Sequence, residues 1–222
     1  MKRILFLVVF FLILVPIGYY FLSDQSKPKP LPVLNPIDVQ QDMVDPEMLR
    51  IGKGHRIGAF RFQNQDGKWI STADMKGRVS VVEYFFTTCK SICPIMNTQM
   101  QRIQRKFAKE PKVRILSFTV DPDTDTIAQM KRYATAHNAK AGQWHFLTGD
   151  KAGLYDLARR SFFVLKPAEA QNLGDAGSDF IHTNNFVLVD QQLRIRGYYD
   201  GTNPKEVSLL QVHIQQLLNE PQ

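Results

Sequence analysis

Two cysteines, the only ones in a chain of 222 residues, lie four positions apart at Cys89 and Cys93. Two thiols at this spacing can form a disulfide, exchange disulfides with another protein, or bind one soft metal ion as thiolates. Residues four apart at the start of a helix share a face, and the N-terminal end of a helix favours the thiolate form. The two sulfurs are therefore expected to lie together and to be reactive, but the spacing alone does not choose among these chemistries.

A site for one soft metal ion needs a ligand beyond the two thiolates, and imidazole suits that role. Five histidines are available. Four of them are expected in structural or surface positions: His55, His137, His145 and His213. His182 differs because it immediately precedes a buried strand that the sequence predicts at 186–190. These residues leave open whether His182 is a metal ligand or an ordinary loop residue.

The stretch that positions the thiols runs from an apolar strand into an amphipathic helix. Residues 79–86 are rich in β-branched and aromatic side chains, which predicts a buried strand. Apolar side chains then recur at steps of three and four, which predicts a helix to about residue 108. These side chains, in which the two methionines are expected as core rather than as metal ligands, are Ile92, Met96, Met100, Ile103 and Phe107. Pro94 suits the first turn of this helix, so both thiols are expected where the strand turns into the helix.

The rest of the chain alternates strands with helices. Strands are expected near 57–62, 68–70, 112–120, 144–148, 186–190 and 193–199, and helices near 126–137, 151–160 and 203–217. This order predicts an α/β domain of three layers around a central mixed sheet, with the thiol turn in the thioredoxin-like position. In such a sheet the loop that carries His182 lies beside the thiol turn. Asp121 and Asp125 are expected as strand-end and helix-capping residues rather than as metal ligands.

The N-terminal residues indicate the compartment. Lys2 and Arg3 precede an unbroken apolar run from Ile4 to Leu22, which as a helix would be about 28 Å long, close to the thickness of a bilayer core. No small-residue cleavage site follows this run, so residues 1–22 are expected to form one uncleaved transmembrane anchor with its positive end inside. The alternative is a cleaved signal peptide, which would leave the rest of the chain on the same side of the membrane.

A Pro-rich linker at 23–50 and a single domain at 51–222 are expected after this anchor. The domain would face the periplasm, or an equivalent compartment, from the inner membrane. The formal charge of +7 does not indicate nucleic acid in an exported chain, and it favours anionic lipid or the acidic face of a partner. One basic cluster is expected as a solvated helix face: Arg102, Arg105, Lys106, Lys109, Lys112 and Arg114.

Three ordered motifs resemble those of one family. Residues 87–94 read TTCKSICP, residues 117–126 read SFTVDPDTDT, and residues 179–190 read DFIHTNNFVLVD. They are similar to the T-x-C-x-x-x-C-P, S-x-D-P-x-x-D-T and H-[ST]-x-x-[FY]-x-[LV]-x-D segments of the SCO/SenC family. This family comprises membrane-anchored, thioredoxin-like copper proteins involved in assembling the dinuclear copper centre of cytochrome c oxidase. The resemblance extends from about residue 55 to the C-terminus.

The resemblance implies that Cys89, Cys93 and His182 are copper ligands. Two thiolates and one imidazole suit three-coordinate Cu(I), and Cu(II) could add water or a carboxylate, whereas structural zinc normally takes four protein ligands. Two positions depart from the family pattern. Lys90 stands where many members have proline, and its ammonium should lower the thiol pKa values. Ile181 stands where a small or acidic residue is common.

The function that the resemblance implies is that of a copper metallochaperone for the copper-centre subunit of cytochrome c oxidase. Other copper donors and a thiol reductase, which keeps Cys89 and Cys93 reduced, would be further partners. The alternative is a thiol–disulfide oxidoreductase in which the same two residues act as a redox pair on the cysteines of the oxidase copper site. A thiol peroxidase and a redox or copper sensor also remain open. Enzymatic activity is therefore not settled by the sequence.

Overall fold

A computed structural model describes residues 3, 10, 12–17, 29–50, 52–165 and 184–220. The chain divides into two compact units, Met1–Leu31 and Pro32–Gln222. Most of the expected anchor at 1–22 lies outside the described residues. Within the described part of the chain, no helix is both long and apolar enough to cross a membrane.

The second unit is built on a seven-stranded mixed sheet with the order β2-β1-β5-β4-β3-β6-β7. Its strands are β1 Arg61–Asn64, β2 Trp69–Ser71, β3 Val79–Phe85, β4 Val113–Thr119, β5 Trp144–Thr148, β6 Asn185–Val189 and β7 Ile195–Asp200. The central strands β3, β4 and β5 run parallel, and β6 pairs antiparallel with β3. All seven residues of β3 are buried, as expected for a central strand covered on both faces.

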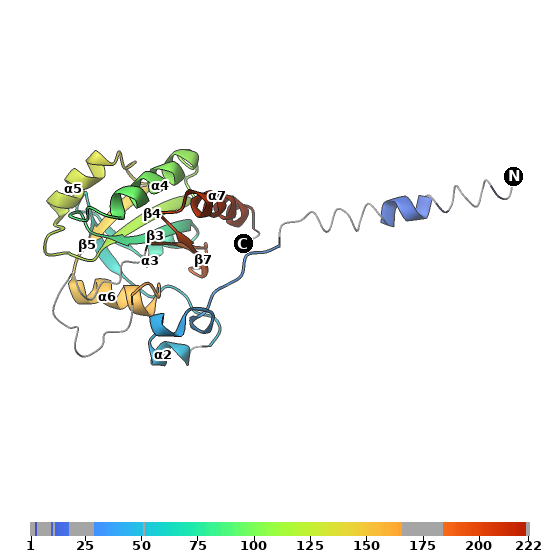
Figure 1. Cartoon of the computed structure of the whole chain (residues 1–222), viewed down its shortest axis with the longest axis horizontal. Coiled ribbons are helices and arrows are strands. Elements are labelled where there is room, and N and C mark those ends of the chain that lie inside the picture. The colour runs from blue at the N-terminus through green and yellow to red at the C-terminus, as the bar shows by residue number, and fades with distance from the viewer. Residues whose placement is uncertain are drawn as a thin grey trace. The chain divides into compact units, whose positions relative to one another are not determined.

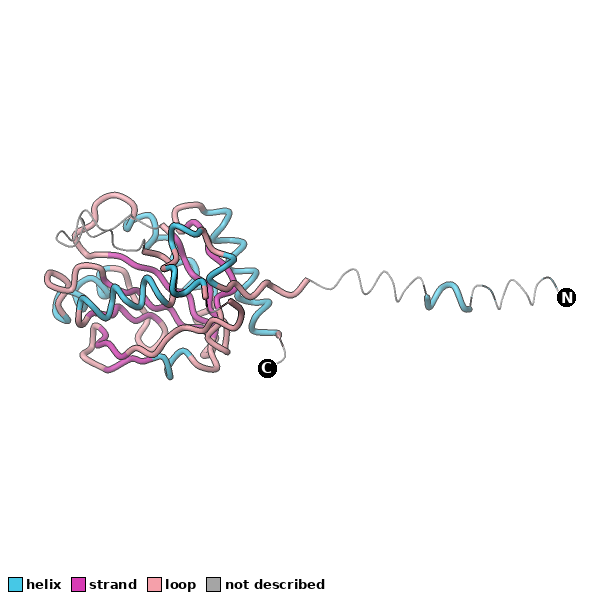
Figure 2. Tube along the Cα trace, turned by 90° about the horizontal axis from the view of Figure 1, so that it is seen from below, coloured by secondary structure: helices cyan, strands magenta, loops and turns pink. Residues whose placement is uncertain are grey.

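Helices cover both faces of this sheet, so that the domain has three layers (Figure 1, Figure 2). The longer helices are α4 Cys93–Lys106, α5 Ile127–Ala136, α6 Lys151–Arg160 and α7 Pro204–Asn219. Figure 1 shows α4, α5 and α7 on one side of the strands and α6 on the other. The expected α/β domain with a central mixed sheet is confirmed.

Successive side chains of β3 point to opposite faces of the sheet and therefore lie in two separate cores. Tyr84 stacks on Phe118 and meets Phe162, which follows α6, with ring centroids 5.3 and 6.1 Å apart. Phe85 points to the opposite face, where its ring lies 5.3 Å from that of Tyr133 on α5. Full burial of an aromatic side chain stabilises a fold by roughly 2–3 kcal/mol. These contacts therefore hold α5 and α6 against the strand that leads to Cys89.

Residues 32–50 fold onto the domain, although the sequence predicted an extended linker over 23–50. They include short helical turns η1 Pro36–Asp38, η2 Gln41–Met43 and α2 Pro46–Leu49. Leu34 N–H donates to the Ile195 carbonyl at 2.8 Å, and Val44 is only 2% exposed. The compact unit thus begins at Pro32 rather than at residue 51. The prolines did not signal this packing because Pro suits the first turn of a short helix as well as an extended spacer.

Helix α3, Thr72–Met75, was also not predicted. It is a single turn, too short to show an apolar periodicity in the sequence. A capping box joins its first residues, since Ser71 N–H and Oγ both donate to Asp74 Oδ2, at 2.8 and 3.0 Å. This turn buries Met75 and leads the chain into β3.

Candidate functional site

Cys89 and Cys93 lie at the junction of β3 and α4, as the sequence predicted. The loop at 86–92 connects the two elements, and Cys93 is the first residue of α4, with Pro94 in its first turn. Both residues are free cysteines, 9% and 3% exposed. Cys89 Sγ lies 3.7 Å from the hydroxyl of Ser91, and Cys89 N–H donates to the Phe86 carbonyl at 3.2 Å. The thiols therefore occupy a tightly folded turn just below the surface.

The two thiols differ in acidity. Burial raises the pKa of Cys89, but hydrogen bonds from the side chain and backbone of Cys93 and from Ser91 outweigh it, so the pKa lies below its ordinary value. Burial raises the pKa of Cys93, and its hydrogen bond with Cys89 adds to the rise. Cys89 is therefore the more acidic thiol of the pair, and Cys93 is the thiol that donates a hydrogen bond to it. The expectation that the helix end would favour the thiolate form of both is wrong for Cys93.

The cause of the lowered pKa of Cys89 also differs from the expected one. We expected the ammonium of Lys90 to favour the thiolate, whereas the favourable contributions come from hydrogen bonds made by Cys93 and Ser91. Lys90 is exposed, and a charge in water is strongly screened. The donors that stabilise the Cys89 thiolate are therefore supplied by the fold of the turn itself.

A buried carboxylate fixes the start of this turn. Asp125 is fully buried, and Thr87 N–H donates to its two oxygens at 3.2 Å each. The hydroxyls of Thr87 and Thr119 donate to it as well. The cap of α5 is Thr126, so Asp125 is not the helix-capping residue that the sequence predicted. It ties the end of β4 to the turn two residues before Cys89.

A second buried carboxyl lies behind the cysteines. Glu83, in the middle of β3, is 1% exposed and accepts a 2.5 Å hydrogen bond from Ser117 Oγ. Trp144 Nε1 donates to the same hydroxyl at 2.8 Å, so the proton of Ser117 points to Glu83. Burial raises the pKa of Glu83 to about 7, and its charge contributes to the raised pKa of Cys93. The sequence argument missed this residue, although an acid inside an apolar strand is an unusual enough signal to have found it.

The predicted third ligand, His182, lies outside the described residues. The register of β3 with β6 places Val82 opposite Val187 and Ser80 opposite Val189, so β6 begins at the end of β3 that leads to the cysteines. Asn184 is the first described residue of this segment. Whether His182 meets the thiols thus stays a prediction.

Two other histidines have the structural roles expected of them. His55 is buried, and its Nε2 lies 2.9 Å from the Ser161 carbonyl. His145 is also buried, and its Nδ1 lies 3.1 Å from Asn64 Nδ2. Burial lowers the pKa of His145 to about 4. Met96 and Met100 are 1% and 0% exposed in the core, as the helical periodicity predicted.

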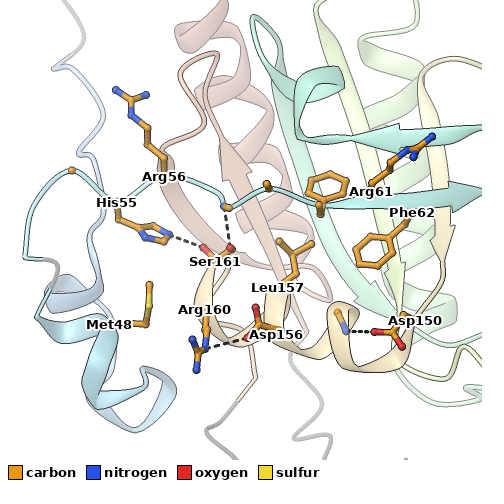
Figure 3. Close-up of a pocket in the computed structure, with 15 residues that line it drawn as sticks. Met48, His55, Arg56, Arg61, Phe62, Asp150, Asp156, Leu157, Arg160 and Ser161 are labelled. Atoms are coloured by element: carbon orange, nitrogen blue, oxygen red, sulfur yellow. Dashed lines mark hydrogen bonds and ion pairs between the residues drawn. The ribbon is translucent and has the colours of Figure 1, made fainter.

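The hollow that Figure 3 shows is separate from the cysteines. It has a volume of about 630 Å³ and lies between the chain at 54–62 and helix α6. Arg160 at its rim pairs with Asp156 at 3.1 Å, and Ser161 accepts the hydrogen bond of Gly58 N–H at 3.1 Å. Its lining contains neither cysteine, so it is not part of the predicted site.

Comparison with known proteins agrees with the arrangement of the cysteine turn on this fold. The SCO1/SenC family model matches residues 50–217. A SCO1 protein homolog of Bacillus subtilis strain 168 is 36% identical over 149 residues, which cover 66% of this chain and 75% of that relative.

Solved structures agree as well. The chain superposes with a TM-score of 0.63 and 30% identity on BsSco, described as a member of the Sco family of cytochrome c oxidase assembly proteins, covering 80% of this chain and 98% of that one. It shares its fold with Bradyrhizobium japonicum ScoI, solved with copper bound, at a TM-score of 0.58 and 22% identity over 74% of this chain and 99% of that one. The family model, the relative and the fold together show that this chain belongs to the SCO1/SenC family.

Proposed function

We propose that this protein is a membrane-anchored copper chaperone that delivers copper to the copper centre of cytochrome c oxidase. The observation that carries the proposal is the pair of free thiols at the start of α4, one of which has a lowered pKa. A thiolate beside a second thiol is a soft donor set, and soft donors favour copper(I) over hard cations. The relatives support this metal, since ScoI was solved with copper bound and BsSco belongs to a family of oxidase assembly proteins.

His182 is proposed as the third copper ligand. Its segment precedes β6, which starts at the cysteine end of β3, and an imidazole completes a three-coordinate Cu(I) site or leaves room for a further ligand on Cu(II). The raised pKa of Cys93 means that copper must displace a proton from this thiol on binding. Binding should therefore strengthen as pH rises.

Transfer would proceed by ligand exchange with the thiolates or imidazoles of the acceptor. Cys89 lies on the loop and is less buried than Cys93, so it is the thiol that an acceptor would reach first. The anchor that the sequence predicts at 1–22 would confine the chaperone to the membrane of its target and raise its effective concentration there. A thiol reductase and other copper donors are the further partners that this cycle requires.

Copper stoichiometry on the reduced protein tests this function. We expect one copper per chain, a sulfur-to-Cu(II) charge-transfer band, and loss of both in Cys89→Ser and in His182→Ala. His137→Ala is the matched control, since this half-buried residue lies at the end of α5 and should leave binding unchanged. Stoichiometric binding that persists in His182→Ala would contradict the proposed ligand set, and absence of copper uptake by the wild type would contradict the function.

A thiol–disulfide oxidoreductase is the second candidate, and the unequal acidity of the two thiols favours it. The Cys89 thiolate would attack a disulfide of the target, and Cys93 would then resolve the mixed disulfide, leaving two target thiols and a Cys89–Cys93 disulfide. Two electrons from a reductase would restore the pair. His182→Ala separates the candidates, because a pure oxidoreductase should keep its rate of exchange with a model disulfide while a chaperone loses copper.

A further inference from the structure

Basic side chains gather at the end of the sheet farthest from the cysteines. This end is formed by the first residues of β3, β4 and β5, because the three strands are parallel and in register. The cluster, here called the basic end, consists of Lys76, Arg78, Lys106, Lys109, Lys112, Arg114 and Lys140. Only Asp74 and Glu110 oppose it nearby in sequence. The opposite end of β4 leads instead into a turn with Asp121 and Asp123.

A hollow of about 570 Å³ lies within the basic end, with Lys109, Arg114 and Lys140 in its lining. Arg114 donates to the Gly142 carbonyl and Lys140 to the Ala108 carbonyl. A guanidinium has five N–H donors and an ammonium three, so both keep donors for an anion. The only acid in the lining, Glu110, accepts a hydrogen bond from Lys112 N–H at 3.0 Å. The lining of the hollow therefore has a net positive charge.

Two cations of this end lie close enough to repel one another. Burial and the charge of Arg78 both lower the pKa of Arg114, and Asp74 opposes them only in part. Arg78 uses one of its nitrogens on the Asp74 carbonyl, at 2.9 Å. A bound anion would reduce the repulsion between these two positive charges.

The chain enters the compact unit at this same end. Leu34 pairs with Ile195, the first residue of β7. Ile195 in turn pairs with Val189 of β6, and Val189 pairs with Ser80 near the start of β3. The apolar run expected as a membrane anchor precedes this point in the sequence. The point at which the chain enters the compact unit and the positive charge therefore lie at the same end of the domain.

We propose that the basic end docks on anionic phospholipid headgroups, with the hollow holding a headgroup phosphate. The proposal rests on the anchoring that is part of the proposed function. Lipid is favoured over an acidic protein because the tether enters at this end, and because a lysine or arginine gains attraction only within about 10 Å of a negative surface. Tethering makes such a weak contact effectively intramolecular.

Docking in this way fixes the distance of the cysteines from the membrane surface. β3 spans Val79–Phe85, and at about 3.3 Å per residue it separates the basic end from the cysteine turn by roughly 20 Å. Cys89 then faces away from the bilayer, where it can meet a copper site raised above the membrane but not one at headgroup level. The basic end thus selects acceptors by the distance of their metal site from the membrane surface.

Lysine labelling on the full-length chain in lipid nanodiscs tests the docking. An amine-reactive reagent and mass spectrometry would compare neutral nanodiscs with nanodiscs containing anionic lipid. We expect severalfold slower labelling of Lys76, Lys109, Lys112 and Lys140 on anionic lipid, reversed by salt. Lys90, exposed at the cysteine end, is the internal control and should not change.

A charge-reversal variant, Lys109→Glu with Lys112→Glu, should abolish the protection of Lys76 and Lys140, whereas Lys90→Glu should preserve it. Equal labelling of the basic end on both lipids would overturn the docking, and this is the result expected if the true partner is an acidic protein. Protection of Lys90 equal to that of the basic end would overturn it as well. A chain that does not remain with the nanodisc would refute the anchor alone. Labelling with added anionic vesicles would then still decide whether the basic end binds lipid.

Discussion

Replacing Glu83 with glutamine should make the protein more stable at neutral and alkaline pH. The carboxyl is 1% exposed in the centre of β3, and burial raises its pKa from 4.5 to about 7. Glutamine has the same shape, and its amide oxygen can still accept the hydrogen bond that Ser117 donates at 2.5 Å. The substitution therefore removes a buried charge without opening a cavity or orphaning the hydroxyl.

The size and sign of the effect follow from the two pKa values. The folded state keeps the proton of Glu83 up to about pH 7, whereas the unfolded chain releases it near the ordinary value of 4.5. Between these values the folded state binds more protons, so the free energy of unfolding falls as pH rises through this window. At about 1.4 kcal/mol per pKa unit, the loss reaches about 3 kcal/mol near pH 8. Glu83→Gln should recover most of it.

Urea denaturation of the unit from Pro32 onward, kept reduced, measures this effect. The difference between Glu83→Gln and wild type should be small near pH 4.5 and grow to about 3 kcal/mol near pH 8. Histidines titrate in both proteins and cancel in this difference. Glu47→Gln is the control, since this side chain is 74% exposed and its substitution should change stability by less than about 0.5 kcal/mol. Parallel pH curves for wild type and Glu83→Gln would refute the reasoning.

Two further predictions concern the cysteine turn. Because the pKa of Cys89 is lowered and that of Cys93 is raised, iodoacetamide near pH 8 should modify Cys89 first. Peptide mass spectrometry measures the two rates, and equal rates would contradict the assigned order of acidity. Asp125→Asn replaces a carboxylate oxygen with an N–H group that faces the donors of Thr87 and Thr119, so it should cost about 2–3 kcal/mol of stability. The same variant should shift the reduction potential of the cysteine pair, since Thr87 begins the turn; a lower stability with an unchanged potential would reduce Asp125 to a purely structural role.

The sequence by itself determined the order of the main elements and the place of the thiols. The apolar run at 79–86 and the helical stripe through Met96 and Met100 are local patterns, and local periodicity reports which faces are buried. The structure confirms both, with β3 at Val79–Phe85 and α4 starting at Cys93. Three motifs were also enough to identify the family, because each combines residue types with fixed spacing. The set of predicted metal ligands, Cys89, Cys93 and His182, rested on that likeness and stays a prediction.

Only the tertiary structure decided how the environment of these residues differs. Cys89 and Cys93 look equivalent in sequence, and burial raises the pKa of both. Hydrogen bonds with Cys93 and Ser91 nevertheless lower the pKa of Cys89, whereas the hydrogen bond with Cys89 raises that of Cys93 further. Asp125 was expected to cap a helix, but it binds a turn that lies 38 positions earlier in the chain. Residues 32–50 were expected to be a spacer, but they pack on β7. For Asp125 and for residues 32–50 the deciding partner is distant in sequence, and for the cysteines the deciding factors are burial and the geometry of the turn. Desolvation and such hydrogen bonds exist only once the chain has folded.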